Sequence, residues 1–144
     1  MSRVMSTGSG DGLLDGLLRV TLAVDHAVAV VAARHELTPQ QVGLLRMLGE
    51  PVSMRELAED RSCDPSNVTG LVDRAERLGL VARTPNPRDR RVRMLELTEE
   101  GRSMRASVTR ELAVEVRVAL GITDDRHGDE LERLLSSLGG VARR

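Results

Sequence analysis

Apolar residues recur at helical spacing along most of this chain, and the pattern predicts a mostly helical protein. Residues 13–35 contain few helix breakers, and the second half of the segment is apolar on nearly every face. A helix of this kind is buried on several sides. Because a chain of 144 residues has little else to cover it, a second subunit is the simplest cover, and we expect a dimer.

Capping residues and stop signals predict three helices in the middle of the chain. The first begins after Thr38 and ends at Gly49, and the second is a short helix that begins after Ser53. The third begins after Asp64 and ends at Gly79, since Asp is a frequent N-cap and Gly a frequent C-terminal cap. Its expected inward face carries apolar residues at helical spacing, namely Val68, Leu71, Val72, Ala75 and Leu78.

A hairpin and two more helices are predicted in the rest of the chain. Two short extended segments, residues 80–83 and 91–97, flank the turn sequence TPNPRDR. Thr98 then caps a long helix that reaches about Leu120, and a last helix spans residues 124–138. We expect the last helix to bury its leucines, Leu131, Leu134, Leu135 and Leu138.

The order helix, tight turn, capped helix and hairpin is that of a winged helix-turn-helix, whose second helix enters the DNA major groove. The polar side chains opposite the apolar face of that helix are of types that reach bases and phosphates. These candidate DNA-binding residues are Ser66, Asn67, Thr69, Arg74 and Arg77. Asp73 is expected to pair with Arg77, four residues further on. An ordinary amphipathic surface helix would carry a similar face, so the helix alone leaves both interpretations open.

The charge distribution favours DNA binding by the hairpin. The net charge of the chain is −1, yet residues 83–93 hold five arginines against one aspartate, a local charge of +4. DNA phosphates would relieve this self-repulsion, and a narrow minor groove attracts inserted arginines. Two prolines stiffen the turn, so less entropy is lost on docking. We therefore expect Arg88, Arg90 and Arg91 to contact DNA, with a solvated loop as the alternative.

A resemblance to a known family rests on the same segments. LTPQQVGLLRML and the stretch that runs from MRELAED to LTEEG resemble the multiple-antibiotic-resistance regulator (MarR) family of bacterial transcription factors. The wing signature of that family, D-x-R-x-x-x-L/V, is matched in full by Asp89, Arg91 and Leu95. The likeness covers about residues 37–101 and weakens in the terminal helices.

The resemblance implies a mostly α fold with a small β-wing, in which the N- and C-terminal helices join two winged domains on a pseudo-palindromic DNA site. It usually implies repression that a small phenolic or other ligand relieves. With the polar N-terminal sequence, it divides the chain into three parts. These are a disordered tail at 1–11, a helical dimerisation region at 12–36 and 98–144, and a winged helix-turn-helix DNA-binding domain at 37–97.

The resemblance also implies roles for single residues. Arg91 would lie in the minor groove, and Asp89 would orient the wing. The family's recognition helix maps onto Ser66, Asn67, Thr69 and Arg74. Two positions depart from the family pattern, because Arg61 stands where an apolar residue is common and Gly70 stands where many members have a longer polar side chain.

Other chemically capable side chains suggest further alternatives. Cys63, the only cysteine, is expected at the N-terminus of the recognition helix, where the helix dipole favours a thiolate. A redox-responsive regulator is therefore one alternative, although a small apolar residue usually fills this position in the family. His26 and Arg19 are candidates for a ligand pocket at the dimer interface. The three histidines lack the spacing of metal ligands, so no metal is expected.

Catalytic and targeting motifs are missing from the sequence. It has no H-E-x-x-H, Gly-rich phosphate loop, G-x-S-x-G or dinucleotide fingerprint, so we expect neither an enzyme nor a cofactor. The N-terminus has no signal-peptide core, and the most apolar run, residues 27–33, is too short to span a bilayer. We expect a cytoplasmic protein without membrane contact. A helical dimer that acts through protein partners, without binding DNA, is a further alternative.

Overall fold

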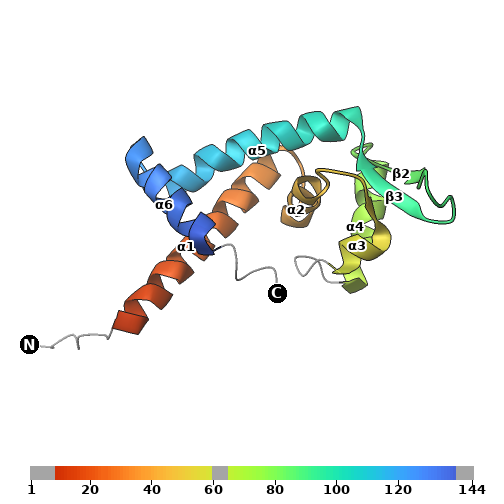
Figure 1. Ribbon diagram of the computed structural model, residues 1–144. Coiled ribbons are helices and arrows are strands. Elements are labelled where there is room, and N and C mark those ends of the chain that lie inside the picture. Colours follow the sequence, from red (N-terminus) through yellow and green to blue (C-terminus); the bar gives the residue numbers. More distant parts are fainter. Residues whose placement is uncertain (1–8, 60–64, 139–144) are drawn as a thin grey trace, which may run out of the picture. The chain divides into compact units, whose positions relative to one another are not determined.

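The computed structural model of the protein describes residues 9–59 and 65–138, and within these ranges it contains six helices and a three-stranded sheet (Figure 1). The helices are α1 (Ser9–Arg34), α2 (Pro39–Met47), α3 (Met54–Glu59), α4 (Pro65–Arg77), α5 (Glu99–Ala119) and α6 (Asp125–Leu138). The strands β1 (Val52–Ser53), β2 (Val81–Pro85) and β3 (Arg93–Leu97) form an antiparallel sheet in the order β1-β3-β2. This arrangement confirms the predicted fold class, a mostly α winged helix-turn-helix.

The chain forms two compact units. The core unit is Val28–Leu112, and the terminal unit contains the residues up to Ala27 and from Ala113 onward. The core unit is packed with aliphatic side chains, because the chain has no Phe, Tyr or Trp. Its largest fully buried side chains are Leu44, Leu45, Leu48, Leu95, Val31, Val42, Val68, Val72, Val81 and Val108.

Reciprocal hydrogen bonds define the starts of α2 and α3. The Thr38 hydroxyl accepts from the Gln41 N–H at 3.2 Å, and the Gln41 side chain accepts from the Thr38 N–H at 2.7 Å. Ser53 and Glu56 form the same kind of capping box at 3.1 and 2.7 Å. The backbone N–H of Ser53 lowers the pKa of Glu56, because its hydrogen bond stabilises the carboxylate. Both predicted helix starts are confirmed.

Strand β1 was not predicted from the sequence. It is only two residues long, and Val52 lies opposite Leu95 of β3. A strand this short has no alternation of apolar and polar residues to recognise. Ser53 therefore has two roles, since it ends the strand and caps α3.

A tight junction joins the end of α4 to the start of α5. Gly79 has a φ of +71°, the left-handed conformation expected of a C-terminal cap. The Thr98 hydroxyl donates to the Gly79 carbonyl at 2.6 Å and accepts from the Gly101 N–H at 2.9 Å. A Cβ on Gly101 would lie 1.9 Å from the carbonyl oxygen of Leu80, so only glycine fits there. The predicted caps at Gly79 and Thr98 are both confirmed.

The apolar surface of α1 is distributed differently from the expectation. Val31 and Ala32, in the second half, are fully buried within one chain. The uncovered apolar residues lie in the first half, where exposed fractions run from 49% to 68% for Leu13, Leu14, Leu17, Leu18 and Leu22. Small side chains let the second half pack closely on its own chain, whereas the longer leucines stay uncovered. The helix also begins at Ser9, within the stretch expected to be a disordered tail.

Residues Gly12–Arg34 of α1 are long and apolar enough to cross a membrane, judged by length and composition alone. This corrects the expectation from residues 27–33, because the whole helix rather than its most apolar run sets the length. A single helix of this kind is weak evidence for a membrane span.

The α6 leucines, which we expect to be buried, lack cover within the single chain. Leu134 and Leu135 are 64% and 50% exposed, and Leu131 is half-buried. The side chain of Leu138 lies outside the described residues. An open groove of about 530 Å³ runs between the end of α5 and α6, with Val116, Leu120, Leu131 and Leu135 among its lining residues. The described part of the chain leaves this groove open.

Candidate nucleic-acid interface

Helix α4 presents a polar face to solvent. Its core-facing side chains, Val68, Leu71, Val72 and Ala75, are buried, as predicted. The opposite face is exposed and carries Thr69, Gly70, Asp73, Arg74 and Arg77. Apart from its chain neighbours and the backbone of its own helix, nothing lies within 4 Å of a Cβ built on Gly70, so this face is open at its centre. Leu78 does not belong to the buried stripe, because it follows the last residue of the helix and is 52% exposed.

The start of this region is described only in part. Ser66 and Asn67 lie in the first turn of α4, but their side chains are outside the described residues. The expected turn at Arg61, the Asp64 cap and Cys63 also lie outside them. The predicted DNA-binding roles of Ser66 and Asn67 remain predictions.

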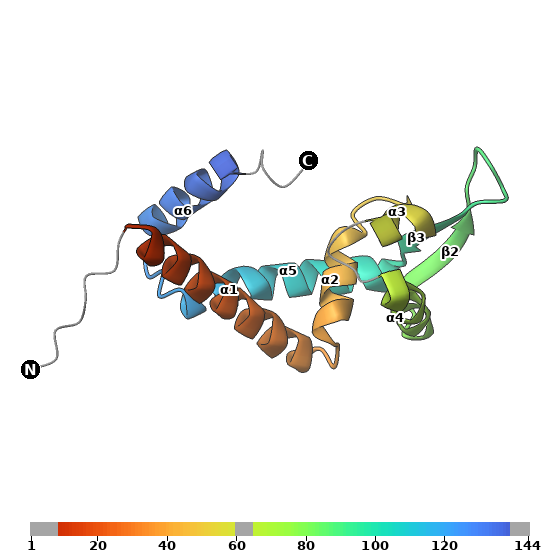
Figure 2. The same ribbon diagram turned by 90° about the horizontal axis from the view of Figure 1, so that it is seen from below.

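The hairpin of β2 and β3 extends into a loop held by its own hydrogen bonds (Figure 2). The strands pair from Val81 opposite Leu97 to Pro85 opposite Arg93, so the loop is residues 86–92. The Asn86 N–H donates to the Val92 carbonyl at 2.9 Å, and the Val92 N–H donates to the Asp89 carbonyl at 3.0 Å. We call residues 81–97 the wing and residues 86–93 the wing tip.

Asp89 shapes the wing tip through a backbone hydrogen bond. Its carboxylate accepts from the N–H of Arg91 at 3.0 Å, two residues further on, which is an Asx turn. The partner of the carboxylate is thus a backbone N–H of the wing tip and not an arginine side chain. Asn86 forms the same kind of turn, since its side-chain oxygen accepts from the Arg88 N–H at 2.9 Å.

Arg83 is not part of the cationic tip. In the middle of β2, its guanidinium donates to the Asp73 carboxylate at 2.5 Å and to the Glu76 carboxylate. The hydrogen bond that Arg83 donates to the Asp73 carboxylate is the main cause that raises the pKa of Arg83. The predicted pair between Asp73 and Arg77 is therefore wrong, and Arg77 donates instead to the Asp73 backbone carbonyl at 3.3 Å. Spacing along one helix cannot reveal a partner on a neighbouring strand.

The wing tip retains a strong positive charge. Four arginines against one aspartate give it a local charge of +3. All four are exposed, and none forms an ion pair with a carboxylate in the described part of the chain. They are Arg88, Arg90, Arg91 and Arg93. Free guanidinium groups concentrated on one loop can bind an anionic polymer.

The predicted pocket residues His26 and Arg19 are both exposed on α1. Neither is among the residues that line the groove between α5 and α6. Within residues 9–59 and 65–138, no group of three or more His, Cys, Asp or Glu side chains could hold a metal ion.

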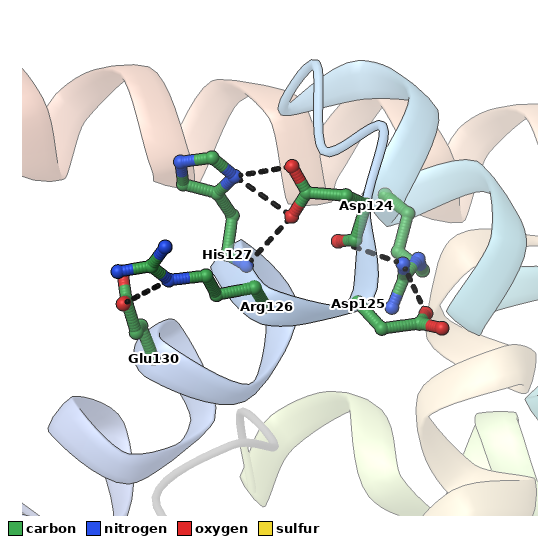
Figure 3. A network of polar contacts seen from close by, with 6 residues as sticks. Asp124, Asp125, Arg126, His127 and Glu130 are labelled. Carbon is green, nitrogen blue, oxygen red and sulfur yellow. Dashed lines mark hydrogen bonds and ion pairs between the residues drawn. The ribbon is translucent and has the colours of Figure 1, made fainter.

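The other two histidines form hydrogen bonds that the sequence did not indicate. His35 Nε2 lies 2.7 Å from Glu111 Oε1 and lowers the pKa of that carboxyl. In the terminal unit, Asp124 accepts from the N–H of His127 at 2.9 Å and from its Nδ1 at 2.8 Å (Figure 3). The backbone hydrogen bond is the main cause that lowers the pKa of Asp124. Arg117 of α5 also contacts the start of α6, where it pairs with Asp125 at 2.9 Å.

The exposed face of α4 and the cationic hairpin define a winged helix-turn-helix protein. The family model for the MarR family matches residues 35–92. The CouR repressor bound to a 23-mer DNA duplex is 30% identical, with a TM-score of 0.74 over 98% of this chain and 100% of that chain. CouR from Rhodococcus jostii RHA1 bound to p-coumaroyl-CoA is 29% identical, with a TM-score of 0.72 over 92% of this chain and 95% of that chain. The chain belongs to the MarR family.

Two curated relatives match a shorter stretch. The transcriptional repressor MdtR of Bacillus subtilis (strain 168) is 46% identical over 66 residues, which are 44% of this chain and 43% of MdtR. The transcriptional activatory protein BadR of Rhodopseudomonas palustris is 41% identical over 71 residues, which are 46% of this chain and 41% of BadR. The chain thus matches less than half the length of each of these curated relatives.

Proposed function

We propose that the protein is a transcriptional regulator that binds double-stranded DNA in a sequence-specific manner. The observation that carries this proposal is the wing tip, where four exposed arginines lack carboxylate partners in the described chain. The polar face of α4 supplies side chains suited to the major groove, and the tip supplies guanidinium groups suited to the minor groove. The likeness to CouR, solved on a DNA duplex, supports the same assignment.

The proposed contacts keep the predicted residues. Arg74 and Thr69, with Ser66, Asn67 and Arg77, would contact the major groove or its phosphates. Arg91 would enter the minor groove, flanked by Arg88 and Arg90. In this proposal residues 37–97 bind DNA, while 12–36 and 98–144 form the dimerisation region.

The regulator would act as a homodimer on a pseudo-palindromic operator in the cytoplasm. The exposed leucines of α1 and the open groove beside α6 both belong to the terminal unit. Clusters of exposed leucines on one helix commonly mark an interaction surface. A second copy of the chain is the partner that would cover them, as the MarR resemblance implies.

Repression relieved by a small molecule is the proposed mode of action, rather than catalysis. CouR is a repressor that has been solved with p-coumaroyl-CoA, and MdtR is also a repressor, whereas BadR is an activatory protein. His26 and Arg19 remain our predicted contacts for an effector at the dimer interface. The core lacks aromatic side chains, so an effector would be held by aliphatic contacts with a His or Arg anchor.

Fluorescence anisotropy with a duplex from the intergenic DNA upstream of the gene tests this function. We expect tighter binding to this duplex than to a scrambled duplex of equal composition, and a steep loss of affinity with salt. Arg91→Gln should weaken binding and reduce the salt slope by about one unit for each subunit of the bound dimer. Arg110→Gln removes the same charge from an exposed position on α5 and serves as the control. Equal affinity for both duplexes, or equal losses in both variants, would overturn the proposal.

A further inference from the structure

One arginine connects the two parts of the candidate interface. Arg83 lies in the middle of β2, and its guanidinium contacts two carboxylates of α4. Asp73 and Glu76 are three residues apart, so they project from the same side of that helix. The planar fork of a guanidinium can serve two carboxylates at once, which an ammonium group cannot do with the same geometry.

The same contacts argue that Arg83 does not bind DNA. Its side chain is only 29% exposed, and two of its donor nitrogens already face carboxylates. A phosphate that approached Arg83 would also approach Asp73, which is 49% exposed, and Glu76, which is 39% exposed. The three side chains together carry a net negative charge, which repels phosphates.

We infer that Arg83 is a positioning residue, which fixes the angle between α4 and the wing so that both can dock on one duplex. The inference rests on the proposed function, because the angle matters only if α4 and the wing tip bind the same DNA. Arg83 acts at the base of the wing, while the arginines that meet DNA lie at its far end.

A small rotation at the base has a large effect at the tip. Arg88 lies five positions after Arg83, and five residues of chain span at most about 16 Å. A rotation of about 10° at the base would therefore move the tip by up to about 3 Å, at the same rise per residue. Hydrogen bonds from a guanidinium require a heavy-atom distance of about 2.7–3.2 Å, so a displaced tip loses its contacts.

Variants that neutralise the two carboxylates of α4 separate positioning from simple electrostatics. Asp73→Asn with Glu76→Gln removes two negative charges near the proposed DNA path. Electrostatics alone predicts tighter binding to the upstream duplex. We expect weaker binding instead, by about five- to tenfold, equivalent to the loss of one contact to a base edge. Tighter or unchanged binding would overturn the inference.

Variants of the arginine itself complete the test. Arg83→Gln should weaken binding at least as much as the carboxylate variant, because it also removes a positive charge, and the combined triple variant should be no weaker than Arg83→Gln, since all break the same interaction. Arg83→Lys keeps the charge but loses the fork, so it should rescue binding only in part. Full rescue by lysine, or additive losses in the triple variant, would reassign Arg83 to a phosphate contact.

A measurement without DNA distinguishes failure of the inference from failure of the proposed function. Backbone ¹⁵N relaxation of the free protein reports the order of the Arg90 and Arg91 amides on the picosecond-to-nanosecond timescale. Arg83→Gln should lower their order parameters, while Arg110→Gln should leave them unchanged. Unchanged tip order in a folded Arg83→Gln protein would overturn the inference even if DNA binds. Lower order parameters at the tip in a protein that binds no DNA would uphold the positioning role of Arg83 and refute the proposed function.

Discussion

Asp89→Ala should weaken DNA binding, although the substitution removes a negative charge from a cationic loop. The Asp89 carboxylate accepts from the Arg91 N–H at 3.0 Å, and the Asp89 carbonyl accepts from the Val92 N–H at 3.0 Å. Alanine keeps the second hydrogen bond and loses the first. The wing tip then populates other conformations, and Arg91 is presented correctly for a smaller fraction of the time. Asp89→Asn is the matched control, because its side-chain oxygen can still accept from the Arg91 N–H.

The ratio of the dissociation constants of the two variants isolates the contribution of this hydrogen bond. A single intramolecular hydrogen bond contributes about 0.5–1.5 kcal/mol net, which corresponds to about a 2- to 13-fold change in the dissociation constant. Loss of an exposed charge contributes about 1 kcal/mol or less, in the direction of tighter binding. Both variants lose this charge, so it cancels between them. Asp89→Ala should therefore bind more weakly than Asp89→Asn, by about 2- to 13-fold for each wing that docks.

Fluorescence anisotropy over a salt series measures both dissociation constants on the upstream duplex. Asp89→Asn should bind at least as tightly as the natural protein, with its advantage fading as salt screens the charge. Thermal melting should be nearly unchanged in both variants, because the loop is exposed. If Asp89→Ala and Asp89→Asn bind equally well at every salt concentration, the orienting role is wrong and Asp89 is only a solvated charge.

Three more predictions concern stability and assembly. Gly101→Ala places a Cβ 1.9 Å from a backbone carbonyl oxygen and should lower the free energy of unfolding by about 1–3 kcal/mol or more in urea titrations, whereas Gly70→Ala, in open space, should not. Leu17→Glu should give a folded monomer in sedimentation experiments, because this leucine is 49% exposed in one chain; a persisting dimer would exclude α1 from the interface. His35 lowers the pKa of Glu111 below its ordinary 4.5, so the ionised carboxylate stabilises the folded protein above pH 4.5, and this stabilisation is lost as pH falls through the folded pKa. In urea titrations from pH 3 to 7, Glu111→Gln should reduce the dependence of the free energy of unfolding on pH. An unchanged dependence would exclude the pair of His35 and Glu111 as its source.

Features fixed by neighbours in the sequence were predictable. The caps at Thr38, Ser53 and Thr98 each depend on a residue three positions away, and each is found where the sequence placed it. The wing and the family were likewise identified from one continuous stretch, which contains the D-x-R signature.

Features fixed by tertiary geometry were not predictable. The ion pair rule for one helix assigned Asp73 to Arg77, but the angle between α4 and β2 brings Arg83 closer. The distribution of buried residues on α1 also depends on which half of the helix meets the rest of its own chain. Hydropathy alone could not distinguish the packed Val31 from the uncovered Leu17.

The junction at Gly79 and Thr98 has a consequence for how this protein can change. A 2.6 Å hydrogen bond closes the chain where the hairpin leaves α4 and returns to α5. The two ends of the wing are therefore held together. Because loop closure entropy grows only slowly with loop length, insertions or deletions in the wing tip would leave both flanking helices in place. Evolution, or a designer, could exchange the wing tip for another of different length or charge, and so retarget the protein to new DNA while keeping its scaffold.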